Sequence, residues 1–146
     1  MKVKKVVLIC NSDGALATFR APLIRALVAS GHTVTTISPR GGYWDELKRL
    51  GAKPIEIEFS RHSVSLFAII KLFFGLFEAI RAEQPDVVHS FTHKAILYGS
   101  AAARLSRVKK IVATVTGLGT LFARSDVRTL LLRKALVWQY RLILPK

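Results

Sequence analysis

Short apolar runs alternate along the chain with longer segments in which apolar residues recur at helical spacing. Five short runs predict strands, at 3–10, 33–38, 54–59, 86–91 and 111–115. The segments between and after them predict helices, at 17–30, 43–50, 64–83, 95–106 and 126–144. Strands that alternate with helices are typical of a parallel sheet covered on both faces. The pattern therefore predicts one α/β domain with a Rossmann-like parallel sheet and helices on both faces.

The helical segment 64–83 is unusual because its polar positions form one narrow stripe. The stripe consists of Lys71, Gly75, Glu78 and Ala82, and the remaining circumference is mostly Leu, Ile and Phe. A helix of this kind needs apolar cover on more than one side. We expect it to be packed on several faces.

Composition supports a folded domain and excludes a disulfide framework. The chain has 146 residues, of which 51% are hydrophobic, which is enough for a core and too much for a disordered chain. Its single cysteine, Cys10, lies in an apolar run, so a buried free thiol is expected and a cysteine-based zinc site is excluded. The run 6–10 is too short for a signal peptide, and no apolar run is long enough for a membrane-spanning helix.

The charge is strongly positive and uneven. Lys and Arg number 23 against 9 Asp and Glu, which gives a net charge of +14. The segment from Arg104 to the end contains ten basic residues and one acidic residue, Asp126, so its net charge is +9. Such a field attracts nucleic acid, anionic lipid or phosphorylated substrates, and charge alone does not choose among them.

Three loops follow predicted strands at the edge where ligands bind in open parallel sheets. Residues 11–15 hold a glycine that permits close approach of backbone to a phosphate or sugar, at the start of the first helix. His93 and Lys94 follow the fourth strand and suit contacts with a hydroxyl or phosphate, and residues 116–120 offer two glycines and two hydroxyls. Each loop is also explained by an ordinary turn. His89 is expected to be structural, and His32 and His62 to lie on surface loops.

The chain resembles glycosyltransferase family 4 in its N-terminal domain. The similarity is carried by the segments 19–23, 25–27, 31–34, 50–52, 59–61, 84–89 and 112–119. The Thr-Gly-Leu-Gly loop at 116–119, the Phe-Ser-Arg at 59–61 and the pair His93-Lys94 resemble the branch that acts on undecaprenyl-diphosphate-linked sugars.

This resemblance implies a GT-B fold, whose N-terminal domain holds the acceptor and whose C-terminal domain holds a nucleotide sugar. It also implies transfer with retention of configuration, with no metal and no other cofactor. By position, Gly14 would approach the donor diphosphate, and Asp13 and His93 would face the acceptor as catalytic residues. The other implied substrate-binding residues are Asn11, Ser12, Arg20, Lys94, Thr116, Gly117, Leu118 and Gly119.

Two departures from the family pattern limit these expectations. Thr116 stands where many members have a histidine, which puts a histidine role at that loop in doubt. The C-terminal donor-binding domain, with its acidic Glu-x7-Glu motif, is absent from the sequence, so residues 1–146 are expected to be the acceptor-binding domain alone, with little or no transferase activity by itself.

Two segments predict contact with a membrane surface. Helix 64–83 is largely apolar, and the C-terminal segment mixes bulky apolar with basic residues, which suits an interfacial helix on anionic lipid. The expected membrane contacts are Arg128, Arg133, Lys134, Trp138 and Arg141. They predict a cytoplasmic protein bound peripherally to the inner face of the plasma membrane; alternatively, both segments are core or domain-contact surface.

Two other functions remain open. One alternative is a non-catalytic, acceptor-binding and membrane-docking subunit of a split glycosyltransferase with a separate C-domain chain, or an inactive fragment. A nucleotide- or nucleic-acid-binding Rossmann module would also explain the +14 charge, but the sequence has no recognised motif for it.

Overall fold

The computed structural model describes residues 2–59, 65–116 and 137–138. They form five strands, five α-helices and one π-helical turn. In chain order these are β1 (Lys5–Ile9), α1 (Asp13–Phe19), α2 (Ala21–Ala29), β2 (Thr33–Ser38), α3 (Trp44–Arg49), β3 (Lys53–Glu56), α4 (Leu66–Glu83), β4 (Val87–Phe91), η1 (Ala95–Gly99), α5 (Ser100–Leu105) and β5 (Lys110–Thr114). The predicted helix 126–144 lies outside the described residues except for Val137 and Trp138, which are helical.

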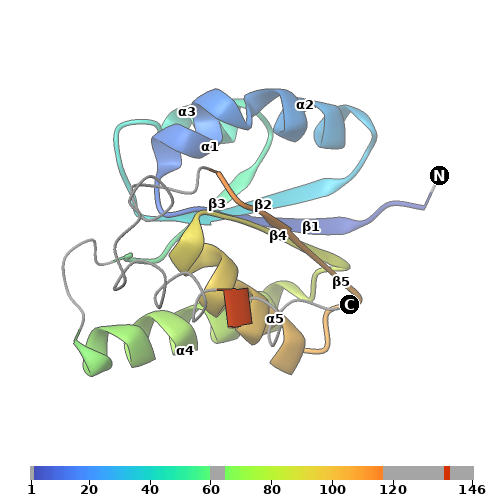
Figure 1. Ribbon diagram of the computed structural model, residues 1–146. Helices are drawn as coiled ribbons and strands as arrows, with labels where there is room; N and C mark the ends of the chain where they lie inside the picture. Colours follow the sequence, from blue (N-terminus) through green and yellow to red (C-terminus); the bar gives the residue numbers. More distant parts are fainter. Residues whose placement is uncertain (1, 60–64, 117–136, 139–146) are drawn as a thin grey trace.

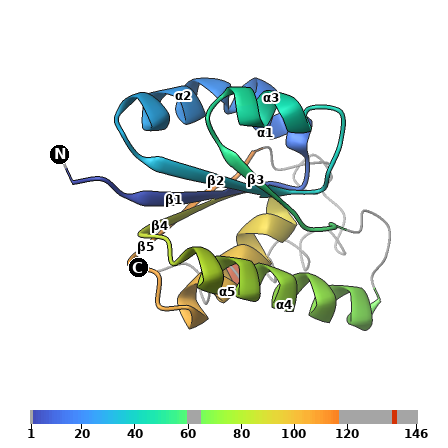
Figure 2. The ribbon, with the colours of Figure 1, turned by 180° about the vertical axis from the view of Figure 1, so that it is seen from behind.

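All strand pairs are parallel, in the order β3-β2-β1-β4-β5. Helices α1, α2 and α3 cover one face of the sheet, and α4 and α5 cover the other (Figures 1 and 2). The predicted fold class, a Rossmann-like parallel sheet between two helical layers, is confirmed.

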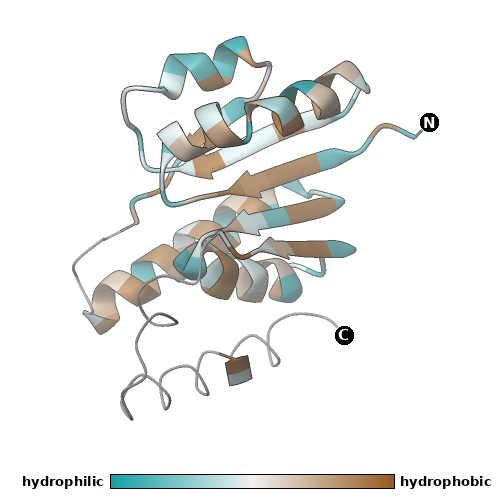
Figure 3. Cartoon of the chain, turned by 45° about the horizontal axis from the view of Figure 1, so that its top comes forward, coloured by the Kyte–Doolittle hydropathy of each residue, from teal (hydrophilic) through white to brown (hydrophobic). Residues whose placement is uncertain are grey.

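The alternation of side chains along β1 divides the core into two halves. Val6, Leu8 and Cys10 pack toward α1 and α2, whereas Val7 and Ile9 pack toward α4 and α5. All five are buried, so β1 is apolar on both faces, as expected for a central parallel strand. In Figure 3 apolar colouring lies along the strands and also on the helices that cover them.

The prediction of one helix over 17–30 is wrong. Helix α1 begins at Asp13, because the Ser12 side chain accepts a hydrogen bond from the Ala15 backbone nitrogen (3.3 Å) and caps the helix. It ends at Phe19, and α2 begins at Ala21 with Pro22 in its first turn. Pro22 cannot donate a backbone hydrogen bond to a preceding helical turn, so the helix divides at Arg20.

The predicted strand 54–59 is also wrong at its end, since β3 stops at Glu56. The residue at its far end still contributes to the core, because Phe59 is buried against α4. The helix predicted over 95–106 begins as the π-helical turn η1 and becomes α-helical at Ser100. A Cβ added at Gly99 would lie 2.9 Å from both Ile9 Cδ1 and Ser90 Oγ, so glycine lets η1 approach the sheet closely.

Helix α4 is less covered than its sequence predicts. Leu72, Leu76 and Ile80 are buried against the sheet, but a second face remains open among the described residues. Its exposed members, called here the α4 stripe, have relative exposures of 71% for Leu66, 76% for Phe67, 45% for Ile70 and 55% for Phe74. The expectation of cover on more than one side is therefore not met by the described part of the chain.

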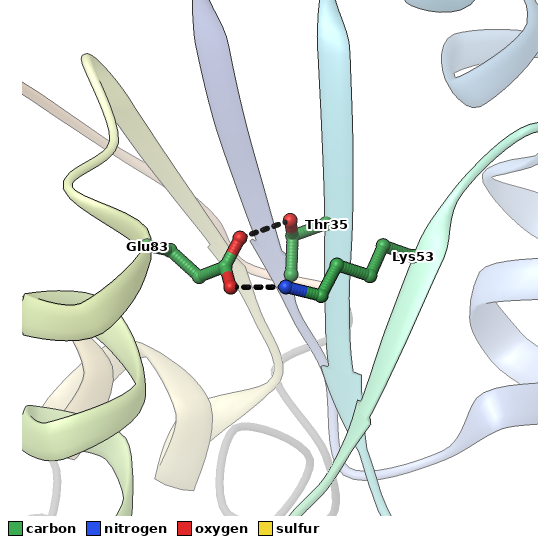
Figure 4. A network of polar contacts seen from close by, with 3 residues as sticks. All are labelled: Thr35, Lys53 and Glu83. Atoms are coloured by element: carbon green, nitrogen blue, oxygen red, sulfur yellow. Dashed lines mark hydrogen bonds and ion pairs between the residues drawn. The ribbon is translucent and has the colours of Figure 1, made fainter.

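The carboxyl end of α4 is tied to the sheet by Glu83 (Figure 4). Glu83 accepts a hydrogen bond from the Thr35 hydroxyl (2.9 Å) and pairs with Lys53 Nζ (2.6 Å). Burial raises the pKa of Glu83, but the hydrogen bonds from Lys53 and Thr35 and the charge of Lys53 outweigh it, and the pKa is lowered. The carboxylate thus joins α4 to β2 and β3.

Within the ranges 2–59, 65–116 and 137–138, no helix has both the length and the apolar character needed to cross a bilayer.

Candidate functional site

The candidate site is a pocket at the carboxyl ends of β1, β4 and β5. In the sheet, β2 and β3 lie on one side of β1, and β4 and β5 lie on its other side. The boundary between β1 and β4 is therefore the topological switch point. A cavity of about 210 Å³ lies there. Its walls are formed by Cys10, Ala15, Phe19, Arg20, Phe91, Thr92 and Thr116. The structure therefore brings residues from all three predicted loops to one edge of the sheet.

The loop after β1 is held by hydrogen bonds within itself. Ser12 caps α1, and Asn11 Oδ1 lies 3.8 Å from the Cys10 thiol sulfur. A Cβ at Gly14 would lie 3.1 Å from the Tyr43 ring, so this glycine allows the loop after β2 to pack closely. Burial raises the pKa of Cys10, which keeps the sulfur as a thiol.

Asp13 connects this loop to the loop after β2. Its buried carboxylate accepts hydrogen bonds from the backbone nitrogens of Gly14 (2.8 Å) and Tyr43 (2.9 Å). A Cβ at Gly41 would lie 2.5 Å from Asp13 Oδ1, closer than any side chain tolerates. Both carboxylate oxygens thus act on the backbone, and Asp13 fixes the shape of this edge.

Arg20 and Phe91 of the pocket wall belong to a stack of side chains that also includes His89. The Arg20 guanidinium carbon lies 4.6 Å from the centroid of the Phe91 ring. The centroid of the His89 ring lies 4.1 Å from the same centroid. His89 Nε2 is 2.8 Å from the Thr114 hydroxyl, so the imidazole is satisfied between β4 and β5. Burial and then the charge of Arg20 lower the pKa of His89, which is therefore neutral at pH 7. The predicted structural role of His89 is confirmed.

Thr92 is the strained residue of the site. Its φ is +72°, a conformation that a β-branched residue rarely adopts. Its hydroxyl oxygen is buried and has no hydrogen-bond partner in the described part of the chain. Strained residues and orphaned buried hydroxyls cluster at functional sites, where the surrounding structure over-determines them.

His93 and Lys94 follow Thr92 but do not line the pocket. His93 is exposed and Lys94 is partly buried. Desolvation by the surrounding protein atoms and then the charge of Lys94 lower the pKa of His93, so the neutral imidazole predominates at pH 7. A neutral histidine at this edge can accept a proton from a hydroxyl.

Of the remaining predicted residues, the structure describes some and not others. Thr116 is exposed and lines the pocket, and Trp138 is exposed. The others, Gly117, Leu118, Gly119, Arg128, Arg133, Lys134 and Arg141, lie outside the described residues, as does His62. His32 was predicted to lie on a surface loop, yet it is partly buried and its Nδ1 accepts a hydrogen bond from the Lys4 backbone nitrogen at 3.3 Å.

Sequence reasoning missed Phe91 and Thr92 as pocket residues. Phe91 is a strand residue like many others in the sequence, and only its place at the carboxyl end of β4 signals a role. The positive φ of Thr92 has no sequence signal, because glycine or asparagine is the residue that usually marks such a turn. In the described ranges no three His, Cys, Asp or Glu side chains gather as a metal site would require.

The model of a family described as "Glycosyl transferase 4-like" matches residues 5–143, which is almost the whole chain and includes every wall of the pocket. The chain belongs to the glycosyl transferase 4-like family. The resemblance identified from the sequence motifs is confirmed.

One curated relative of this glycosyl transferase 4-like chain is 30% identical over 138 residues. It is the N,N'-diacetylbacillosaminyl-diphospho-undecaprenol alpha-1,3-N-acetylgalactosaminyltransferase of Campylobacter jejuni. The match covers 94% of the present chain and 37% of the relative, so the chain spans well under half of the relative's length. The predicted branch, with a relative that acts on an undecaprenyl-diphosphate-linked sugar, is confirmed.

Solved structures share the fold at low sequence identity. A glycosyltransferase from Rickettsia africae superposes with a TM-score of 0.61 at 18% identity, over 87% of this chain and 35% of that one. A putative UDP-N-acetylglucosamine 2-epimerase from Listeria monocytogenes gives a TM-score of 0.63 at 20% identity, over 93% and 38% of the two chains. The same α/β domain therefore occurs in proteins named for different reactions. The fold alone does not determine the chemistry.

Proposed function

We propose that this domain forms the acceptor side of a retaining glycosyltransferase. The enzyme would move a sugar from a nucleotide-sugar donor to a polyprenyl-diphosphate-linked or other saccharide acceptor during assembly of a cell-surface glycan. The observation that carries this proposal is the pocket at the switch point, inside the region matched by the family. The activity named for the C. jejuni relative supports the class of acceptor.

In this proposal His93 and Asp13 have different roles. The neutral imidazole of His93 accepts a hydrogen bond from an acceptor hydroxyl, while Asp13 holds the loop after β1 in place through its bonds to Gly14 and Tyr43. Asn11, Ser12, Gly14, Lys94 and residues 116–119 would complete the substrate contacts. The donor side, and any metal-independent departure of its nucleotide, would come from a donor-binding domain that is not among residues 1–146.

A second proposal concerns the place of action. The α4 stripe begins at the amino end of α4, and α4 runs antiparallel to the strands, so this end lies toward the same edge of the sheet as the pocket (Figure 1). An apolar surface on a chain of net charge +14 suits the interface of an anionic membrane. We propose peripheral binding to the inner face of the plasma membrane, where a polyprenyl-linked acceptor is held.

The test combines the chain with a candidate donor-binding domain, a panel of nucleotide sugars and a polyprenyl-diphosphate sugar. Sugar transfer that requires both proteins supports the proposed enzyme. Binding of the acceptor by this chain without transfer under any pairing supports the alternative, a non-catalytic acceptor-binding subunit. If the chain shows neither acceptor binding nor sugar transfer, both the enzyme and the subunit are rejected.

A further inference from the structure

Arg20 is the charged side chain among the seven residues that line the pocket. It lies at the junction of α1 and α2, where its backbone interrupts the helix and its side chain reaches the ring of Phe91. Phe91 is buried in the core, so it provides a fixed platform for the guanidinium. A cation over an aromatic face at this distance is held electrostatically and loses little further freedom when it binds a ligand.

Among residues 2–59, 65–116 and 137–138, no carboxylate forms an ion pair with Arg20. The ion pairs of the described residues involve Lys48, Arg49, Lys53 and Lys109, and Arg20 is in none of them. The acid nearest to it in this loop, Asp13, uses its oxygens for the backbone nitrogens of Gly14 and Tyr43. The guanidinium donors of Arg20 also make no hydrogen bond to another described residue, so they remain available to a ligand.

The rest of the pocket wall combines two threonines with the side chains of Cys10, Ala15, Phe19 and Phe91. Thr116 is exposed and carries a hydroxyl, whereas the hydroxyl oxygen of Thr92 is buried, with no hydrogen-bond partner among the described residues. The cavity, at about 210 Å³, is smaller than the pockets that enclose whole drug-sized ligands, so it matches one part of a larger substrate. Guanidinium and hydroxyl donors together favour phosphate oxygens, which arginine binds in a two-pronged geometry.

We propose that Arg20 binds a phosphate group of the substrate in this pocket, with Phe91 as its positioning residue. The evidence for this site is the geometry around Arg20. The proposal depends on the proposed function only for which molecule carries the phosphate. Two sources share the chemistry: the diphosphate of a polyprenyl-linked acceptor and that of a free nucleotide.

The test measures binding to the full chain by calorimetry with four probes. They are inorganic pyrophosphate, farnesyl diphosphate, UDP and, as a probe without phosphate, farnesol. We expect the three phosphate probes to bind, with affinity that falls as salt is raised. Tighter binding of farnesyl diphosphate than of UDP assigns the site to the acceptor, and the reverse order assigns it to a nucleotide.

Arg20→Ala is expected to weaken phosphate binding about 10-fold or more, because a charged hydrogen-bond donor is lost. The matched control is Arg25→Ala, which removes an equal charge from an exposed position on α2 and should leave binding unchanged. Arg20→Lys keeps the charge but loses the planar stack, so an intermediate affinity is expected. Thermal unfolding of each variant shows whether a loss of binding comes from a loss of folding.

Three results would overturn the site: no binding of any phosphate probe, equal binding of farnesol and farnesyl diphosphate, or equal losses in Arg20→Ala and Arg25→Ala. Failure of the proposed function is a separate outcome. Phosphate binding that depends on Arg20 without sugar transfer keeps the site and rejects the enzyme. Sugar transfer with an unchanged KM in Arg20→Ala keeps the proposed enzyme and rejects the phosphate site.

Discussion

Asp13 accepts a hydrogen bond from the backbone nitrogen of Tyr43 at 2.9 Å, and so links two loops whose residues lie 30 positions apart. One loop follows β1 and carries the first predicted ligand contacts, and the other follows β2 and leads into α3. The same carboxylate also accepts from the nitrogen of Gly14. The site edge is therefore shaped by a buried charge that is satisfied by backbone alone.

Replacing Asp13 with Ala is expected to destabilise the fold by about 1–3 kcal/mol, since two backbone donors lose their charged acceptor. Chemical denaturation measures the free energy of unfolding. Asp45→Ala is the control, because Asp45 makes an exposed pair with Lys48 and should contribute less than about 1 kcal/mol. Equal effects of the two replacements would show that the Asp13 bonds do not hold the loops.

Gly41→Ala should destabilise the domain by roughly 1–3 kcal/mol, because its methyl group would lie 2.5 Å from Asp13 Oδ1. At Gly42 an added Cβ meets nothing within 4 Å, so Gly42→Ala should change stability by less than about 0.5 kcal/mol. Thermal unfolding of both variants compares neighbouring positions with the same substitution. A neutral Gly41→Ala would mean that the two loops are not packed as described.

Glu83→Gln should cost about 1 kcal/mol at neutral pH, where the carboxylate holds Thr35 and Lys53. Because the folded-state pKa lies below the ordinary value of 4.5, the carboxylate stabilises the fold fully above that value. Its contribution is lost as the pH falls through the lower, folded-state pKa. Urea unfolding at neutral and acid pH should show the difference between wild type and Glu83→Gln shrinking on acidification.

The control for that measurement is Glu78→Gln, an exposed position on the same helix. It should alter stability little at either pH. A Glu83→Gln penalty that grew on acidification would contradict the lowered pKa.

His93→Ala is expected to reduce turnover of the reconstituted enzyme by about 100-fold or more, because a group that accepts a proton is removed. The wild-type enzyme should keep His93 neutral across pH 7, since the folded pKa lies below 6.5, and should lose activity only at more acid pH. His32→Ala, on a loop before β2, serves as the control. An activity midpoint above pH 6.5, or full activity in His93→Ala, would remove His93 from the mechanism.

Replacing Phe67 and Ile70 of the α4 stripe with Ser should weaken co-sedimentation with vesicles of anionic lipid. Leu105→Ser is the matched control, because Leu105 is 66% exposed at the end of α5 and lies outside the stripe. Neutral vesicles should bind the wild-type chain less than anionic ones. Negligible binding to both kinds of vesicle would reject the membrane surface.

The sequence predicts the layers of this fold better than the details of its site. Strand 33–38 matches β2 at both ends, because a β-branched run lies between Gly31 and Pro39. Gly31 and Gly51 directly follow the predicted helices 17–30 and 43–50, and both have positive φ after α2 and α3, as glycines that end helices do. These features depend on local propensity, which one sequence contains.

The start of α1 was missed although its signal was present, since Ser12 is a favoured cap and Asp13 a favoured first-turn residue. The approach of Arg20 to Phe91 could not be predicted, because 71 positions of chain and four strands must first fold to bring them together. The convergence of three loops followed from strand order, whereas the residues that form the pocket wall depended on side-chain packing.

The geometry of Asp13 and Gly41 predicts that positions 13 and 41 are constrained as a pair during evolution. While an aspartate occupies 13, any side chain at 41 collides with it, and once glycine is lost from 41 the aspartate has no room. A lineage can therefore leave this arrangement only through an intermediate that folds poorly, or by exchanging both residues together. Among diverged relatives, aspartate and glycine should be inherited or replaced jointly at these two positions, even where the surrounding loops differ in length.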